Sequence, residues 1–225
     1  PTRIITEATA LAIGRGRFIF DMEGRRAVNL WTQRHRQEPP LAQQALWRQK
    51  AGLFFEHIRF LIPDEQQCGR FLDWLAHCEQ RPQVLPHHGY LMVTETFGVG
   101  RNWLAAVLAR VWSGEVAMSL DLQALVTGNF NGRISGKRLA VVDEVWVEAS
   151  RNGASRWAIE AKLRGIVTEE TRTINPKYGR EHTEFNVLRW LLFTNHWDAL
   201  PMPKGDRRFD VISNPTVPRP EPHPT

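Results

Sequence analysis

The sequence predicts an α/β fold in which a mainly parallel β-sheet lies between two layers of helices. The first observation behind this prediction is that short apolar runs alternate with longer segments whose apolar residues recur at helical spacing. Strands that alternate with helices are typical of parallel sheets, because each helix returns the chain to the edge where the next strand begins. The second observation is that the runs are apolar at nearly every position, as expected for strands buried on both faces.

The elements of this sheet lie in the second half of the chain. The helix predicted over 101–112 places Leu104, Leu108 and Val111 on one side, which would face the sheet. The other predicted elements are a helix at 156–165 and strands at 89–94, 139–144, 187–195 and 209–212.

The region before residue 86 is predicted to form a small companion domain. The stretch "RFIFDMEGRRAVNLW" has two apolar runs around Glu23-Gly24, which is the pattern of a β-hairpin. Helices follow at about 41–60 and 64–79, and the linker "RPQVLPHHG" then contains two prolines. We therefore expect a β-hairpin and helical region at 1–85, the main domain at 86–213, and a disordered proline-rich tail at 214–225.

Composition limits the class of protein. Hydrophobic residues make up 42% and charged residues 24%, which is an ordinary globular balance. No run is long enough for a membrane span and no signal peptide opens the sequence, so we expect no membrane partner. The two cysteines form no C-x-x-C pair, which favours a reducing cytoplasm. The net charge of +5 favours an anionic partner such as nucleic acid.

The segment "ETFGVGRN" between the first core strand and its helix resembles a phosphate-binding loop of the form G-x-x-x-x-G-K-[S/T]. Such a loop binds phosphates through backbone N–H groups at a helix N-terminus. Arg101 replaces the lysine and keeps the positive charge, while Asn102 offers an amide oxygen to Mg²⁺. An ordinary strand-to-helix turn fits the segment equally well. The predicted nucleotide contacts are Glu95, Thr96, Phe97, Gly98, Val99, Gly100, Arg101 and Asn102.

A second motif favours the nucleotide interpretation. The run "LAVV" ends in Asp143-Glu144, the form of a Walker B strand. Asp143 can hold hydrated magnesium, and Glu144 can orient and polarise an attacking water. Each motif alone is common by chance, but a loop of the first kind followed by a strand of the second kind is much less common.

Two further motifs follow in order. Asn195 comes just after the apolar run "VLRWLLFT", where a neutral amide can position a water near the terminal phosphate. Arg207 and Arg208 come directly before the last strand, where an arginine can reach the nucleotide of a neighbouring subunit. Without this context Asn195 would be a turn residue and the arginines solvated surface residues.

These four motifs, in this order, resemble the C-terminal ATPase region of virus-, phage- and plasmid-encoded primase-helicases, over about 84–212. These are AAA+-type P-loop proteins related to superfamily 3 helicases. The resemblance implies a three-layer P-loop NTPase, ATP and Mg²⁺ as ligands, and a homo-oligomeric ring, hexameric by analogy. It implies that Arg208, or alternatively Arg207, acts between subunits. It also implies the motor section of a longer phage or prophage replication protein in the bacterial host cytoplasm.

Members of this family carry a β-hairpin before the strand of the third motif, and its tip contacts single-stranded DNA. The stretch "VTEETRTINPKYGREHTEFNVL" fits such a hairpin, with the tip at 175–179. Lys177 can pair with a phosphate and Tyr178 can stack on a base. A plain surface turn is the alternative.

Three functions are compatible with these motifs. The first is an ATP-dependent DNA helicase motor. Because replacing a P-loop lysine often removes hydrolysis while sparing binding, the second is a non-hydrolysing P-loop-fold module for DNA binding or assembly. The third is an AAA+ loader that acts on protein. ATP turnover separates the first from the second, and stimulation by single-stranded DNA separates the first from the third.

Overall fold

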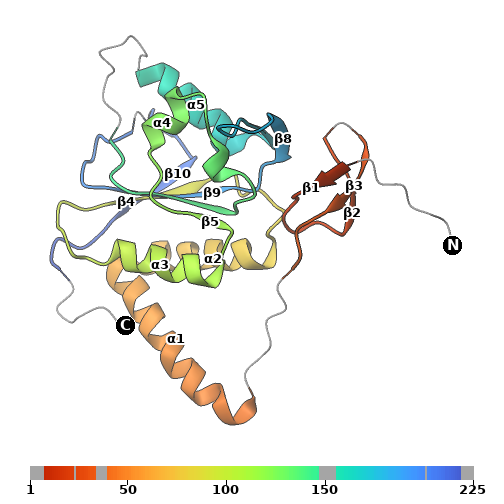
Figure 1. The fold of residues 1–225 in the computed structure, drawn as a ribbon. Coiled ribbons are helices and arrows are strands. Elements are labelled where there is room, and N and C mark those ends of the chain that lie inside the picture. Colours follow the sequence, from red (N-terminus) through yellow and green to blue (C-terminus); the bar gives the residue numbers. More distant parts are fainter. Residues whose placement is uncertain (1–7, 23, 34–39, 147–155, 201, 219–225) are drawn as a thin grey trace.

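The structure is a computed structural model that describes residues 8–22, 24–33, 40–146, 156–200 and 202–218. Its centre is a parallel sheet with the strand order β10–β4–β9–β6–β5 (Figure 1). The predicted α/β fold with a mainly parallel sheet is confirmed. The strands are β4 (Gly89–Val93), β5 (Val116–Ala117), β6 (Leu139–Val142), β9 (Arg189–Thr194) and β10 (Phe209–Ser213).

The three middle strands are buried at every position, which explains their continuous apolar runs. In the register of the sheet, Val93 of β4 is paired with Thr194 of β9, and Val142 of β6 with Leu192 of β9. The segments that follow β4, β6 and β9 therefore leave the sheet at the same edge. This edge brings together the first three predicted motifs.

Helices cover both faces of the sheet (Figure 1). Helices α2 (Glu65–Gln80) and α3 (Arg101–Val111) lie on one face, and α4 (Leu122–Thr127) and α5 (Arg156–Thr168) on the other. The sequence did not indicate β5 or α4, because both are shorter than the window in which a period can be recognised. A local signal for α4 does exist, since the Asp121 side chain caps the helix by accepting a hydrogen bond from the Ala124 N–H at 2.9 Å.

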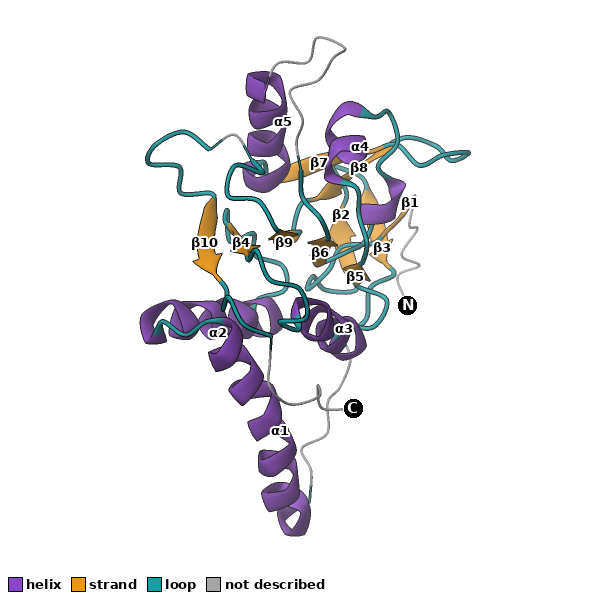
Figure 2. Cartoon of the chain, turned by 90° about the vertical axis from the view of Figure 1, so that its left-hand side faces the viewer, coloured by secondary structure: helices purple, strands orange, loops and turns teal. Residues whose placement is uncertain are grey.

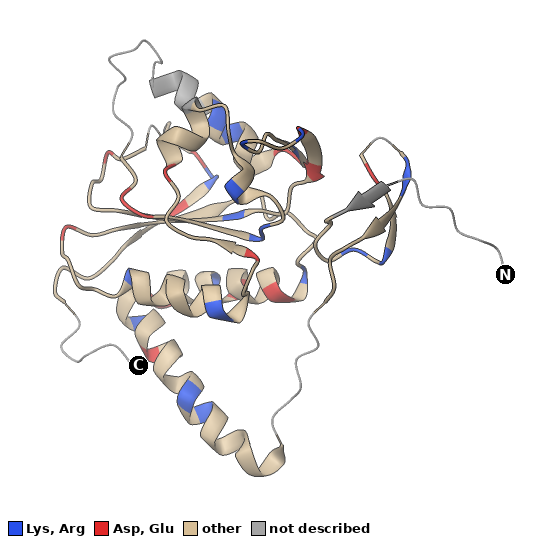
Figure 3. Ribbon diagram, in the orientation of Figure 1, with Lys and Arg blue, Asp and Glu red and all other residues tan. Residues whose placement is uncertain are grey.

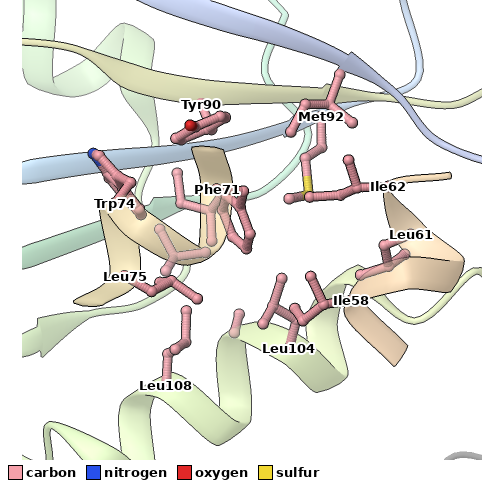
Figure 4. Close-up of a cluster of buried hydrophobic side chains, with 14 of the residues drawn as sticks. Ile58, Leu61, Ile62, Phe71, Trp74, Leu75, Tyr90, Met92, Leu104 and Leu108 are labelled. Carbon is pink, nitrogen blue, oxygen red and sulfur yellow. The ribbon is translucent and has the colours of Figure 1, made fainter. Parts of the chain in front are cut away.

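One hydrophobic core joins the sheet to the helices before residue 85 (Figure 4). Phe71 of α2 packs edge-on against Tyr90 of β4, with ring centroids 4.9 Å apart. Ile58 near the end of α1 (Leu41–Leu61) and Leu104 of α3 belong to the same buried cluster. The predicted boundary at residue 85 therefore falls between elements that share one core.

Most of α1 extends away from the body of the protein (Figure 2). Its buried residues are confined to the last two turns, at His57, Ile58 and Leu61. Near the other end, the Trp47 side chain is 54% exposed. Among the described residues, α1 is held at this C-terminal end, where it packs with α2 and α3 and where the Leu61 carbonyl accepts a hydrogen bond from Asn214.

Two antiparallel hairpins confirm two sequence predictions. At the N-terminal end, β2 (Phe18–Phe20) pairs with β3 (Arg26–Asn29), and β1 (Ala8–Ala10) joins them in a small sheet. Further along, β7 (Thr171–Ile174) pairs with β8 (His182–Phe185) directly before β9. The second hairpin is the one expected before the strand of the third motif.

The start of the predicted disordered tail is held against the sheet. The Asn214 side chain donates to the Leu61 carbonyl at 2.8 Å, and the Thr94 hydroxyl donates to the Pro215 carbonyl at 3.0 Å. These bonds contradict disorder from residue 214 onward, and the rest of that prediction, at 219–225, lies outside the described residues. None of the described helices has both the length and the apolar character of a membrane span.

Candidate active site at the carboxyl edge of the sheet

A cavity of about 390 Å³ lies at the edge where β4, β6 and β9 end. In sheets of this kind, ligands bind in the crevice outside the carboxyl ends of the strands. Each of the first three sequence motifs contributes to the cavity, whereas the arginine pair does not. The lining residues are Thr96, Phe97, Gly98, Val99, Gly100, Arg101, Asn102, Trp103, Asp143, Glu144, Phe193 and Asn195.

The loop after β4 turns directly into the N-terminus of α3. Gly98 and Gly100 have φ values of 78° and 95°, a left-handed conformation that favours glycine. Gly100 is the N-cap of α3 and has no side chain to cap the helix, so the first N–H groups of the helix remain available to an anion. Glu95 is exposed and does not line the cavity, unlike the rest of the predicted loop.

Arg101 is bound to the edge of the sheet. Its guanidinium group donates to the Met92 carbonyl at 3.0 Å, to the Thr194 carbonyl at 2.6 Å and to the Asn195 side-chain oxygen at 2.7 Å. It also lies 5.5 Å from the centre of the Phe193 ring. Burial lowers the pKa of Arg101, and the nearby Asp143 charge opposes this effect. The residue in the lysine position thus joins the ends of β4 and β9.

A guanidinium group carries five N–H donors, and three hydrogen bonds account for part of them. Among the described residues, the Nε–H and the second Nη2–H have no acceptor. Arg101 therefore combines a structural role, in holding Asn195, with capacity to contact an anion.

The acidic pair follows β6 into the same cavity. Burial raises the pKa of the Asp143 carboxyl; the Arg101 charge lowers it, and the Glu144 charge adds to the rise. Glu144 is exposed and has a φ of 52°, which is uncommon for a residue with a side chain. The next residue, Val145, fixes this turn through its N–H, which donates to the Phe193 carbonyl at 2.8 Å. Strained backbone of this kind is frequent at functional sites.

The donor set fits magnesium in one particular way. Mg²⁺ at nucleotide sites takes one or two carboxylates and completes its shell with phosphate oxygens and water. Asp143 supplies such a carboxylate, and Asn102 at the start of α3 adds an amide oxygen at the cavity wall. Among the described residues, no group of three or more His, Cys, Asp and Glu side chains could hold a metal ion by itself.

Two contacts to this loop were not predicted. The buried His57 of α1 places its Nε2 3.0 Å from the Gly100 carbonyl, and its ring packs on Trp103 with centroids 4.6 Å apart. On the other side, the Thr96 hydroxyl donates to the Thr216 carbonyl at 2.6 Å. Both contacts join segments that are distant in sequence, so no local pattern could have indicated them.

Arg207 and Arg208 lie at the opposite edge of the sheet. The Arg208 carbonyl accepts a hydrogen bond from the N–H of Gly89, the first residue of β4. The predicted nucleotide loop instead follows Val93, the last residue of β4. Five residues at about 3.3 Å each place roughly 16 Å between the two edges. Arg208 is buried and ion-paired with Asp206, while Arg207 is exposed. A role for either arginine at the nucleotide therefore requires a second chain.

The predicted DNA-contacting residues lie at the tip of the β7–β8 hairpin. Tyr178 is 94% exposed, and the Lys177 ammonium lies 5.1 Å from the centre of its ring. The tip is anchored by Asn175, whose N–H donates to the Asn131 side-chain oxygen at 2.7 Å. Lys and Arg positions also occur along the neighbouring α5 (Figure 3).

Comparisons with known proteins find a similar sequence and similar folds. The chain is 25% identical over 149 residues to a DNA primase-polymerase of Nitratiruptor phage NrS-1, and the match covers 66% of this chain and 20% of that protein. The predicted resemblance to phage-encoded primase-helicases is confirmed. The chain spans only about a fifth of the length of this curated relative.

Solved structures of the same relative share the fold. The apo structure of the NrS-1 C-terminal region (305–718) has a TM-score of 0.73 and 21% identity, covering 93% of this chain and 48% of that one. An A-form apo structure of this region has a TM-score of 0.70 and 19% identity, covering 95% and 48%. A family model described as a family of unknown function (DUF5906) matches residues 92–208. The chain belongs to this family, DUF5906.

Proposed function

We propose that this chain is the ATP-dependent motor domain of a phage-type replication helicase. One observation carries the proposal. Arg101, Asp143, Glu144 and Asn195 follow three adjacent parallel strands and line one cavity at a helix N-terminus. Anion-binding backbone, a carboxylate pair and a neutral amide in one cavity are the parts that phosphoryl transfer to water requires. The homology to a phage primase-polymerase supports the biological setting.

Each residue has a distinct role in this proposal. The loop at 96–102 binds the phosphates through its backbone N–H groups and Arg101. Asp143 and Asn102 hold Mg²⁺, which when bound neutralises charge on the phosphate oxygens. Glu144 orients the attacking water and accepts its proton, and Asn195 fixes the position of that water. General-base assistance of this kind contributes roughly 10²–10⁴-fold.

The same proposal assigns the opposite edge of the sheet to contacts between subunits. An exposed Arg207, or Arg208 after release from Asp206, would reach the nucleotide of a neighbouring chain in a ring, hexameric by analogy with primase-helicases. The Lys177–Tyr178 hairpin tip would contact single-stranded DNA, with movement driven by the state of the nucleotide.

The deciding experiment compares the parent chain with Glu144→Gln, which keeps the shape of the side chain and removes the base. Fluorescent ATP should bind both with similar affinity, while phosphate release by the variant falls by roughly 10²-fold or more. Assays with and without single-stranded DNA test whether DNA stimulates turnover. Equal turnover by the two proteins would overturn the assignment of Glu144.

A second function is favoured by the geometry of Arg101. Because the guanidinium group already bonds two backbone carbonyls and Asn195, the site could bind ATP as a structural ligand without hydrolysing it. The chain would then be a nucleotide-stabilised DNA-binding or assembly module. ATP binding that is tight, with no turnover under any DNA condition, would select this alternative.

A further inference from the structure

The small N-terminal sheet has two different faces. In the β2–β3 pair, Ile19 lies opposite Ala27, and Phe20 lies opposite Arg26. Because successive side chains of a strand point to opposite faces, the first pair shares one face, and the second pair shares the other face with Phe18. Ala27 is only 1% exposed, whereas Phe18 and Phe20 are 58% and 63% exposed. One face therefore packs on protein, and the other is open.

Side-chain contacts attach this sheet to the body of the protein. The Arg15 guanidinium group lies 3.8 Å from the centre of the Phe185 ring at the end of β8. After β3, the Trp31 indole N–H donates to the Glu115 carboxylate at 3.2 Å, directly before β5. The sheet thus lies beside the β7–β8 hairpin and at the amino edge of the main sheet (Figure 1). The proposed ATP chemistry, at the carboxyl edge, uses none of these residues.

Positive charge accompanies the exposed rings. Arg26 lies directly opposite Phe20 on the open face, which places their Cβ atoms roughly 5 Å apart. Arg26 is exposed and has no ion-pair partner among the described residues. The preceding Arg25 is instead paired with Asp21 at 2.8 Å. The three strands of this sheet contain no acidic residue. The open face therefore combines aromatic rings with an available cation.

We propose that the open face of the N-terminal sheet binds single-stranded nucleic acid. Neighbouring bases would stack on Phe18 and Phe20, and a backbone phosphate would lie beside Arg26. Exposed aromatic side chains on a small sheet are suited to this ligand, since each ring can stack on an unpaired base. Every base has a π-face, so binding would have little sequence preference. The proposal does not depend on ATP hydrolysis at the carboxyl edge.

The chemistry of this face favours such a ligand over other occupants. A duplex would hide the faces of its bases from the rings, and an uncharged apolar segment would leave Arg26 without an anion. A symmetric contact between two copies would bring Arg26 of both chains onto one apolar patch, where like charges repel. The position beside the β7–β8 hairpin agrees with the proposal, because one strand could pass from the proposed contact at Lys177 and Tyr178 to this sheet.

DNA and RNA offer the same stacking and phosphate chemistry, so the test has an arm for each. Labelled oligo(dT), oligo(U) and a DNA duplex of the same length are titrated with the chain in the absence of ATP, and binding is followed by fluorescence anisotropy. Both single strands should bind more tightly than the duplex. Tighter binding of oligo(dT) would name DNA as the ligand, tighter binding of oligo(U) would name RNA, and equal binding would assign both.

The aromatic rings are tested by the double variant Phe18→Leu with Phe20→Leu, which keeps the apolar surface. Affinity for the preferred single strand should fall by about fivefold or more for each ring, the effect expected for a stacked base. Phe18→Tyr with Phe20→Tyr keeps the rings and should bind as tightly as the parent. Phe55→Leu is the matched control, since it removes a ring that is 40% exposed from α1 instead. The loss should be the same in the Lys177→Ala background, because the hairpin tip is a separate contact.

Arg26→Gln tests the phosphate contact. The slope of log affinity against log salt should decrease by about 0.7, the value for one phosphate contact on a single strand. Arg25→Gln is the matched control, because it removes the same charge from the neighbouring residue, whose guanidinium group is paired with Asp21. Its slope should equal that of the parent.

Four results would overturn the proposal. Parental affinity in the leucine double variant would show that the rings do not contact the strand, and duplex binding as tight as that of the single strands would exclude stacking. Equally reduced slopes for Arg25→Gln and Arg26→Gln would leave only a diffuse attraction between charges. Loss of self-association or of binding to phosphatidylserine vesicles in the double variant, with oligonucleotide affinity unchanged, would assign the face to a second copy or to a membrane. Thermal denaturation of each variant establishes that it is folded before titration.

Discussion

At the scale of single residues, Arg101 stands where the predicted phosphate-binding loop would have a lysine. A lysine has one compact ammonium group, whereas the planar guanidinium group of Arg101 spans the ends of two strands. It also fixes the amide of Asn195, the residue proposed to orient water. The residue that departs from the loop motif therefore also connects the loop to the third motif.

Arg101→Lys tests whether this connection restrains turnover. Lysine would release the Asn195 amide, so we expect kcat for ATP to rise several-fold with little change in KM. The thermal midpoint should fall, because losing hydrogen bonds to the strand ends costs roughly 1–3 kcal/mol. A fall in kcat would instead show that the guanidinium group itself contacts the transferring phosphoryl group.

Asp143→Asn should raise the thermal stability of the protein while removing magnesium-dependent ATP binding. Burial raises the pKa of Asp143 in the folded state, so folding favours the protonated carboxyl. The resulting contribution to stability is present below the pKa of the unfolded state and is lost as pH rises through the pKa of the folded state. At neutral pH the variant should therefore melt at a higher temperature than the parent. Magnesium-dependent ATP binding should be lost, as calorimetry with and without Mg²⁺ would show. A lower melting temperature at pH 7 would contradict the assigned direction of the pKa shift.

The same pKa shift predicts the pH dependence of the parent. Only the ionised carboxylate binds Mg²⁺, so magnesium-dependent ATP affinity should weaken on acidification at a pH above the ordinary aspartate value of about 3.9. ATP titrations across a pH series, limited to conditions where the protein remains folded by circular dichroism, measure this. Affinity that is constant down to the ordinary value would remove Asp143 from the metal site.

At the scale of elements, the β7–β8 hairpin combines a rigid base with an exposed tip. Glu184 in β8 accepts four hydrogen bonds at the base, and Asn175 is held by Asn131 below the tip. Tyr178 at the tip has a φ of 68°, a left-handed conformation that the tight turn after Pro176 imposes. Because the base fixes where the tip side chains lie, less conformational entropy is lost when the tip contacts a DNA strand.

Lys177→Ala should weaken single-stranded DNA binding and reduce the slope of log affinity against log salt by about 0.7, the value for one phosphate contact on a single strand. Fluorescence anisotropy at several salt concentrations measures both quantities. Lys204→Ala is the matched control, since Lys204 is exposed but follows β9 rather than belonging to the hairpin. An unchanged affinity and slope would place the DNA path elsewhere, with α5 as the next element to test.

At the scale of the whole molecule, the two edges of the sheet have complementary parts of one proposed site. Glu144 lies at the carboxyl edge, and Arg207 and Arg208 lie at the amino edge of the same sheet. One chain cannot bring these parts together, but neighbouring chains in a ring can. The ion pair of Arg208 with Asp206 makes the exposed Arg207 an equal candidate for the cation that acts between chains.

Mixing variants tests this arrangement. Arg207→Ala and Arg208→Ala should each bind ATP normally, and the one that removes the trans cation should lose roughly 10³-fold in turnover. Mixing that variant with Glu144→Gln should recover part of the activity, because a mixed interface pairs an intact Glu144 with an intact arginine. Analytical ultracentrifugation verifies that the mixture assembles. Assembled mixtures without recovery at any ratio would exclude action in trans.

The sequence by itself determined the parts of the molecule that depend on local periodicity. Runs of buried residues located β4, β6, β9 and β10, and helical spacing located α1, α2, α3 and α5, because burial on one or two faces leaves a repeating pattern. The order of three short motifs then indicated one edge of a parallel sheet, since consecutive strands of such a sheet end at the same side.

The tertiary structure alone decided what depends on contacts between distant segments. The bonds of Arg101 to Thr194 and Asn195 and the contact of His57 with Gly100 leave no periodic trace in the sequence. The spacing in α2 shows an apolar face but not that this face shares a core with the sheet. The same holds for the buried nitrogens of Arg172 and Trp190 that have no acceptor among the described residues. The residue type fixes which donors a side chain carries, but only the tertiary structure places acceptors beside them.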